Sequence, residues 1–285
     1  MALLFLAPSL LVFGLFIFFP LVRSVFLSLH TQDIIGRPTL FVGLDNFRVM
    51  FSSPAFVRVL VTTGLYTLLT VLPGIALAAG LALLVNNRLA GMRIFRTAFA
   101  MPFAYSVATA AVVFGTLYNP AVGILNYVLR LFGLGAVGWL TDPAVALVSI
   151  AITTVWMSLG YNLLVLLAGM GAVPDHLYEA ARLDGAGGWR LVRGITLPLL
   201  TPSLFFLVVV NTIGSLQSFG QIYILTRGGP AGSTTTLVYS IYDRAFANNN
   251  NDFGLASAQA LVLLAIVLTV TALQFGVLER KVFYR

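Results

Sequence analysis

Residues 179–189 read Glu-Ala-Ala-Arg-Leu-Asp-Gly-Ala-Gly-Gly-Trp. Together with the residues that follow as far as Pro198, they form the only substantial polar, helix-compatible stretch between two long apolar runs. Pro174 suits the first turn of a helix, and Gly185 supplies the left-handed backbone at which a helix commonly ends. Gly187 and Gly188 permit further turns, and apolar side chains then recur at helical spacing over residues 189–195. The pattern predicts a protruding knob, in which a glycine elbow joins two short helices and the second helix leads into Pro198.

The composition indicates a membrane protein. Of the 285 residues, 59% are hydrophobic and only 9% are charged, whereas about a quarter of a soluble domain is charged. Several apolar runs of about 20 residues or more can each cross about 30 Å of hydrocarbon. We therefore expect an all-α, polytopic protein. Because the chain has no cysteine and two histidines, disulfides and thiolate metal sites are excluded, and a metalloenzyme has little support.

Six transmembrane helices are expected within a single domain over residues 1–285, and the knob at 174–195 connects the fourth helix to the fifth. No basic segment precedes the first apolar run and no small-residue cleavage site follows it, so we expect that run to be a retained span. The predicted spans are 2–29, 56–85, 97–118, 143–170, 199–225 and 255–278.

Basic residues in the connections predict the orientation. Nine occur in three short segments on the side of the knob, namely Arg88, Arg93, Arg96, Arg182, Arg190, Arg193, Arg280, Lys281 and Arg285. Five are spread over the longer segments of the other side, namely Arg37, Arg48, Arg130, Arg227 and Arg244. The knob and both termini are therefore expected in the cytoplasm. The net charge of +7 is explained by this topology signal, without nucleic acid as a partner.

Polar residues inside the fifth predicted span suggest a solute path. Asn211, Ser215 and Ser218 recur on one helical face, and Gln217 and Gln221 form a neighbouring pair. Two interpretations stay open: the stripe lines a path for a hydroxyl-rich solute, or it makes hydrogen bonds between helices. Weaker candidates for lining the same solute path are Tyr161, Asn162 and Tyr105.

Two further side chains have alternative interpretations. Arg23 either attracts an anion or extends its charge to the membrane interface. His176 has no metal-like partner in the sequence and is interpreted as a surface contact.

The sequence lacks the common motifs of nucleotide-binding and catalytic sites. No phosphate-cradling Gly-x-x-x-x-Gly-Lys-Ser/Thr occurs, so the energy for any active transport must come from a partner. Neither a Gly-x-Ser-x-Gly elbow nor a His-Glu-x-x-His motif is present. We therefore expect a chain that is not an enzyme and binds no cofactor of its own.

The knob resembles the cytoplasmic EAA loop of ABC importer permeases, the membrane subunits that work with an extracytoplasmic binding protein. The similarity is carried by Glu179-Ala180-Ala181, by Gly185 and by Ile195, Leu197 and Pro198. In that family the loop is a coupling helix that docks in a groove of the ATP-hydrolysing subunit. The resemblance assigns ATPase coupling to Glu179, Ala180, Ala181, Asp184, Gly185 and Pro198.

Other segments extend the resemblance over nearly the whole chain. Residues 43–47 and the Gly-Gly-Pro at 228–230, followed by Thr-Thr-Thr-Leu, look like the carbohydrate-uptake, maltose-type branch. Residues 203–211 and 279–285 are most similar to the first permease subunit of the glycerol-3-phosphate importer. Because the spans hold almost no basic residues, two classes of solute stay open, a neutral sugar and a glycerol phosphate.

The resemblance implies a type I importer permease in the inner membrane of a bacterium. Its partners would be a second, homologous permease, two copies of an ATP-binding subunit that hold ATP and magnesium, and an extracytoplasmic solute-binding protein. Two alternatives remain, a secondary transporter or a structural membrane-bundle subunit without an ATPase. A secondary transporter is expected to show broken helices in paired repeats, and the sequence does not reveal any.

Overall fold

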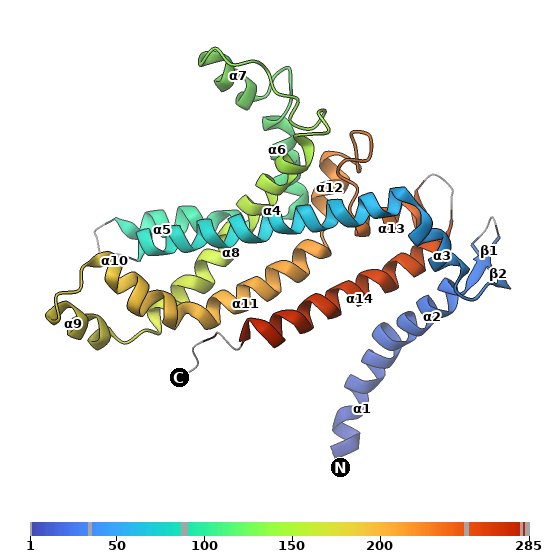
Figure 1. Ribbon diagram of the computed structural model, residues 1–285, viewed down its shortest axis with the longest axis horizontal. Coiled ribbons are helices and arrows are strands. Elements are labelled where there is room, and N and C mark those ends of the chain that lie inside the picture. The colour runs from blue at the N-terminus through green and yellow to red at the C-terminus, as the bar shows by residue number, and fades with distance from the viewer. Residues whose placement is uncertain (1, 34–35, 87–90, 248–250, 280–281, 283–285) are drawn as a thin grey trace. The chain divides into compact units, whose positions relative to one another are not determined.

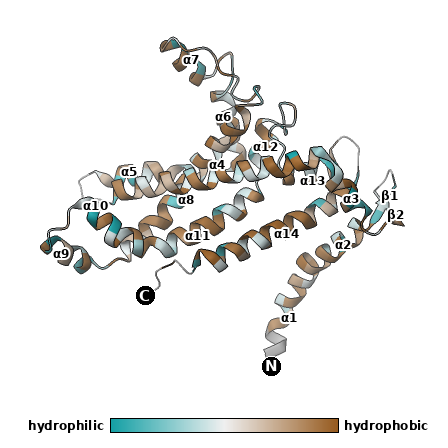
Figure 2. Cartoon of the chain, viewed as in Figure 1, coloured by the Kyte–Doolittle hydropathy of each residue, from teal (hydrophilic) through white to brown (hydrophobic). Residues whose placement is uncertain are grey.

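A computed structural model describes residues 2–33, 36–86, 91–247, 251–279 and 282 (Figure 1). The expected all-α, polytopic class is confirmed, because within these described residues five helices are long and apolar enough to cross a membrane, or six if one bent pair counts as a span. Figure 2 shows how apolar residues cover these helices. Four of the basic residues that predict the orientation lie outside the described part, namely Arg88, Arg280, Lys281 and Arg285.

The chain divides into two compact units, which are described separately. The first unit comprises Met1–Thr62 and Thr235–Leu268. It begins with α1 (Ala2–Phe13), the π-helix η1 (Gly14–Phe18) and α2 (Phe19–Ser28). Its remaining elements are the hairpin of β1 (His30–Gln32) and β2 (Pro38–Phe41), α3 (Asp45–Ser52), the start of α4 (Pro54–Val85), α13 (Leu237–Phe246) and most of α14 (Phe253–Val277).

The core of the first unit joins α3, α4, α13 and α14. Its buried apolar residues are Met50, Phe56, Val59, Leu237, Leu255 and Ala258. Asn46, from the stretch at 43–47, donates from Nδ2 to the carbonyls of Ser28 at 2.8 Å and His30 at 3.2 Å. Gly254 packs against the same turn, since a Cβ there would lie 2.7 Å from the His30 carbonyl oxygen. The end of the first span is thus fixed by one amide and one glycine.

The second unit comprises Thr63–Thr234 and Thr269–Arg285. After the rest of α4 come α5 (Met92–Ala100), the 3-10 helix η2 (Met101–Ala104), α6 (Val107–Leu117), α7 (Ile124–Leu131) and α8 (Ala146–Gly171). These are followed by α9 (Asp175–Leu183), α10 (Gly188–Leu191), the π-helix η3 (Val192–Thr196), α11 (Leu197–Leu216) and α12 (Gly220–Leu225).

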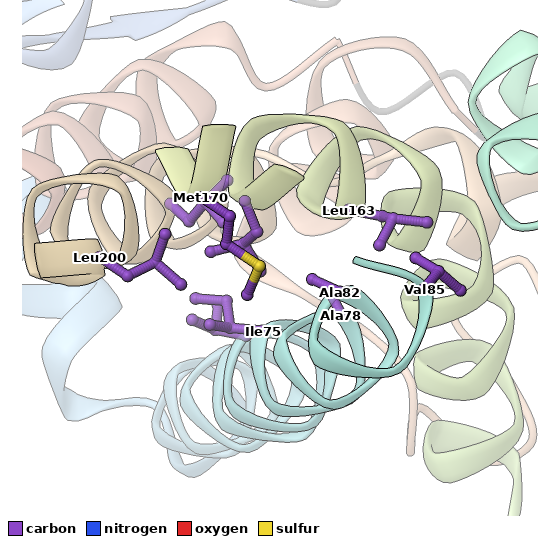
Figure 3. Packing of buried hydrophobic residues seen from close by; sticks show 10 residues of the cluster. Ile75, Ala78, Ala82, Val85, Leu163, Met170 and Leu200 are labelled. Carbon is purple, nitrogen blue, oxygen red and sulfur yellow. The ribbon is translucent and has the colours of Figure 1, made fainter. Parts of the chain in front are cut away.

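Small residues let the helices of the second unit approach closely. Ala78 and Ala82 of α4 are fully buried against α8 and α11, with Leu163, Met170 and Leu200 around them (Figure 3). Between α8 and α11, a Cβ at Gly169 would lie 2.4 Å from Ser203 Oγ. Since lipid gives helices no hydrophobic drive to associate, such close backbone packing holds the bundle together.

The third and fifth predicted spans differ from the observed helices. The helix pair Met92–Ala104 and Val107–Leu117 bends by 103°, where the sequence suggested one span at 97–118. The fifth span begins earlier than residue 199, because α10, η3 and α11 run on continuously over Gly188–Leu216. It also ends at Leu216, since Gln217–Phe219 interrupt the helix before α12.

Prolines do not end the fifth span because other groups compensate for their missing N–H. Pro198 is the second residue of α11, just after the π-helix η3, and Pro202 lies one turn farther along α11. The carbonyl of Pro198, which the N–H of a non-proline residue at 202 would have paired, accepts the Thr201 hydroxyl at 2.6 Å. The helix can therefore continue from the knob into the span.

Candidate functional site

The knob consists of α9, a glycine elbow and α10. Asp175 lies in the first turn of α9, where its charge favours the helix dipole. Gly185 has a φ of 77° and donates to Arg182 O at 3.0 Å, while Ala186 N donates to Ala181 O at 2.9 Å. This pair of bonds is a Schellman ending, so the predicted turn at Gly185 is present.

Large apolar side chains flank the elbow and face outward. Leu183 is 89% exposed and Trp189 is 70% exposed. Sequence reasoning placed Trp189 on the apolar side of a short helix and gave Leu183 no role. Apolar side chains this exposed are typical anchors of a protein interface. The sequence-predicted coupling residues surround them: Glu179, Ala180, Asp184 and Gly185 are exposed, Ala181 is half-buried, and Pro198 is half-buried at the base of α11.

The knob is attached to the membrane helix at two points. Its second arm, α10, continues through η3 into α11 without a break. Its first arm is tied to the same helix by the Tyr178 hydroxyl, which lies 3.1 Å from Oγ1 of the buried Thr196. A force on the elbow would therefore reach α11 through both arms.

The polar residues of α11 and the following turn form hydrogen bonds with other helices. Asn211 Nδ2 donates to Asn162 Oδ1 of α8 at 2.9 Å. The hydroxyl of Ser215 lies 2.7 Å from Thr70 Oγ1 of α4, and that of Ser218 lies 3.0 Å from the Tyr66 hydroxyl. Within this chain, the helix-packing interpretation accounts for these contacts.

The predicted stripe is not one continuous helical face. Because the helix stops after Leu216, Ser218 and Gln221 are brought together by the turn, where Ser218 Oγ donates to Gln221 Oε1 at 3.1 Å. The turn has little room, since a Cβ at Gly220 would lie 2.6 Å from Val107 Cγ1. Of the stripe, Gln217 is exposed and Asn211 is half-buried.

These hydrogen-bonded residues of α4, α8, α11 and the following turn form a polar layer, and the sequence analysis did not identify all of its members. The layer also includes Tyr66, Thr67 and Thr70 of α4 and Thr154 of α8, whose hydroxyl lies 2.7 Å from that of Tyr66. The run of hydroxyl residues at helical spacing in the second predicted span is the sequence pattern that could have identified them. Asn162 is fully buried and its Nδ2 has no acceptor, so the layer keeps one free hydrogen-bond donor.

Aromatic rings adjoin this layer. Tyr161 is half-buried and packs on Phe103, with ring centroids 5.6 Å apart. Tyr105 is 45% exposed at the bend before α6 and packs on Trp156 at 5.9 Å. Tyr161 therefore lies on α8, the helix of Asn162, and Tyr105 packs against the same helix.

Three further basic side chains lie at the surface. Arg23, Arg227 and His176 are all exposed. Among the residues described by the structure, no group of three His, Cys, Asp or Glu could hold a metal ion.

The comparisons with known proteins agree with the sequence resemblance. The family described as "Binding-protein-dependent transport system inner membrane component" matches residues 2–284. The sn-glycerol-3-phosphate transport system permease protein UgpA of Agrobacterium fabrum is 37% identical, over 99% of this chain and 95% of that protein. The sulfoquinovosyl glycerol transport system permease protein SmoG of the same bacterium is 35% identical, over 99% of this chain and 91% of that protein.

A solved structure shows the same fold. It is a chain of the bacterial alginate ABC transporter in complex with alginate pentasaccharide-bound periplasmic protein. The TM-score is 0.85 at 24% identity, covering 97% of this chain and 93% of that chain. The type I importer permease fold expected from the resemblance is therefore confirmed.

Proposed function

Because this chain belongs to the family of binding-protein-dependent transport system inner membrane components, we propose that it is the permease subunit of an ABC importer for a sugar or a glycerol-phosphate-type solute. ATP hydrolysis by partner subunits drives the uptake, and this chain binds no cofactor itself. Its partners are a second permease, two ATP-binding subunits and an extracytoplasmic solute-binding protein. The chain acts as one permease domain in the inner membrane, with both termini in the cytoplasm.

The observation that carries this proposal is the continuity of the exposed elbow with a membrane helix. Leu183 and Trp189 are free to enter a groove of an ATPase subunit, while α10 continues through η3 into α11. A stiff connection of this kind supports the alternating-access mechanism, in which closure of the ATPases moves the elbow and α11 together. A secondary transporter would have no use for such an exposed apolar knob.

Co-purification tests the proposal directly. The full-length chain, expressed with its genomic neighbours, should retain an ATP-binding subunit, whereas the double variant Leu183→Ser/Trp189→Ser should lose it. The control is Phe206→Ser at an exposed position of α11, which should leave the complex intact. Retention of the ATPase by the elbow variant would contradict docking at this site.

The solute class is proposed from the relatives. UgpA and SmoG are named for glycerol-3-phosphate and sulfoquinovosyl glycerol, which are both anionic glycerol derivatives. Arg227 is exposed and follows the fifth span on the side proposed to face outward. Arg227→Gln should therefore slow uptake of glycerol-3-phosphate more than uptake of a neutral sugar. Equal slowing of both solutes would count against an anionic substrate.

A further inference from the structure

The segment between α6 and α8 presents an apolar surface that the proposed transport function does not use. Four residues of α7 recur at positions i, i+3, i+4 and i+7, and all are exposed: Ile124 by 55%, Tyr127 by 56%, Val128 by 41% and Leu131 by 67%. Phe132 and Leu134, just beyond the helix, are also exposed. We name the face of Ile124, Tyr127, Val128 and Leu131 the α7 apolar face.

The opposite side of α7 is fixed to its own chain. Asn126 is fully buried, donates from Nδ2 to Val137 O at 3.0 Å, and accepts from Val137 N at 3.1 Å and from Trp139 Nε1 at 2.9 Å. The turn before the helix is equally tight, since a Cβ at Gly123 would lie 2.3 Å from Asn119 O. The side chains of the α7 apolar face therefore cannot turn inward without breaking these contacts.

The position of the segment puts it at the surface of the bilayer. It follows the end of α6 at Leu117 and precedes the start of α8 at Ala146, so membrane helices hold it at both ends. Within the second unit, Figure 1 shows α7 beyond α6 and away from α5 and α11. A helix of eight residues is about 12 Å long and cannot cross about 30 Å of hydrocarbon.

The chemistry of the segment favours lipid over protein as the occupant. The α7 apolar face is aliphatic apart from Tyr127, whereas the centres of protein interfaces are enriched in aromatic residues, methionine and arginine. Arg130 is the only charged residue between Asn119 and Thr141, and it lies exposed on the side of α7 opposite Val128. An aliphatic face with a cation on the polar side is the pattern of a helix that lies in the membrane interface. Val112 in the middle of α6 and Val148 in the first turn of α8 are exposed apolar residues as well.

We propose that α7 is an interfacial anchor, which inserts its apolar face into the acyl boundary of a phospholipid leaflet and places Arg130 among the headgroup phosphates. The anchor would hold the loop between the third and fourth spans on the membrane.

Spin labels on single cysteines test this placement, since the natural chain has no cysteine. Val128→Cys and Arg130→Cys variants of the full chain, with its co-purifying subunits, would be reconstituted in vesicles of phosphatidylethanolamine and phosphatidylglycerol. A label at Val128 should collide readily with oxygen and severalfold less with a water-soluble nickel chelate than a label at Arg130. Its depth should be roughly 5–10 Å below the headgroup boundary.

Two results would overturn the anchor. Equal access of the nickel chelate to both labels would mean that water covers the α7 apolar face. Shielding of the Val128 label from both oxygen and nickel would mean that a protein subunit covers it. A Leu131→Cys label on the same face should reproduce the Val128 pattern, so a local folding defect at one position cannot decide the outcome.

Discussion

The Tyr178 hydroxyl of α9 lies 3.1 Å from Thr196 Oγ1 at the base of the fifth span. The two residues belong to opposite arms of the glycine elbow, and Thr196 is buried. The hydrogen bond therefore closes a triangle whose other sides are the elbow and the helix from α10 to α11. Because both arms are connected, a force on the elbow moves α11, whereas without the hydrogen bond the two arms could bend apart.

Removing this bond should weaken the coupling between ATP hydrolysis and transport. Because a hydrogen bond contributes about 1 kcal/mol, Tyr178→Phe should lower transport per ATP hydrolysed by up to about fivefold. Solute uptake and ATPase activity would be measured together in vesicles. Adding Thr196→Val to Tyr178→Phe should have little further effect, and fully additive losses would show that the two residues act separately.

Gly185 should tolerate no β-branched residue. Its φ of 77° costs such a side chain about 1–2 kcal/mol, so Gly185→Val should distort the elbow and abolish uptake while the chain still inserts in the membrane. Gly187→Val is the matched control, because both glycines have open space around a Cβ but Gly187 has an ordinary φ of −78°. Similar uptake by the two variants would refute a role for the left-handed turn.

Single cysteines should report the orientation of the chain. Ala121 is exposed in the segment after α6, and Gly187 is exposed in the elbow. An impermeant thiol reagent added to intact cells should label Ala121→Cys and leave Gly187→Cys unlabelled until the membrane is opened. The inverse pattern would place the elbow outside and exclude ATPase docking.

The exposed and buried members of the polar stripe should behave differently. Ser215→Ala removes a buried hydroxyl pair with Thr70, so thermal unfolding should show a loss of about 0.6–2 kcal/mol. Gln217→Leu removes an exposed amide, so it should leave stability unchanged and lower uptake by about fivefold if the amide meets the solute. Wild-type uptake by Gln217→Leu would limit the solute path to other residues.

The sequence by itself determined the features that depend on local chemistry. Long apolar runs predict membrane helices, since every backbone polar group in hydrocarbon must be paired within the helix. Gly185 predicts the elbow, since the left-handed region favours glycine. The ordered motif around that glycine was sufficient to indicate the family.

Only the tertiary structure decided which polar groups meet. Ser215 pairs with Thr70, 145 residues away, and Ser218 pairs with Tyr66, 152 residues away, and no local pattern encodes such partners. The break after Leu216 and the 103° bend before α6 also depend on packing, because neighbouring helices must satisfy the backbone groups that a broken helix leaves free. The spacing of Asn211, Ser215 and Ser218 could indicate a polar face, but only their packed neighbours show that Ser215 and Ser218 are buried in the bundle while Gln217 stays exposed.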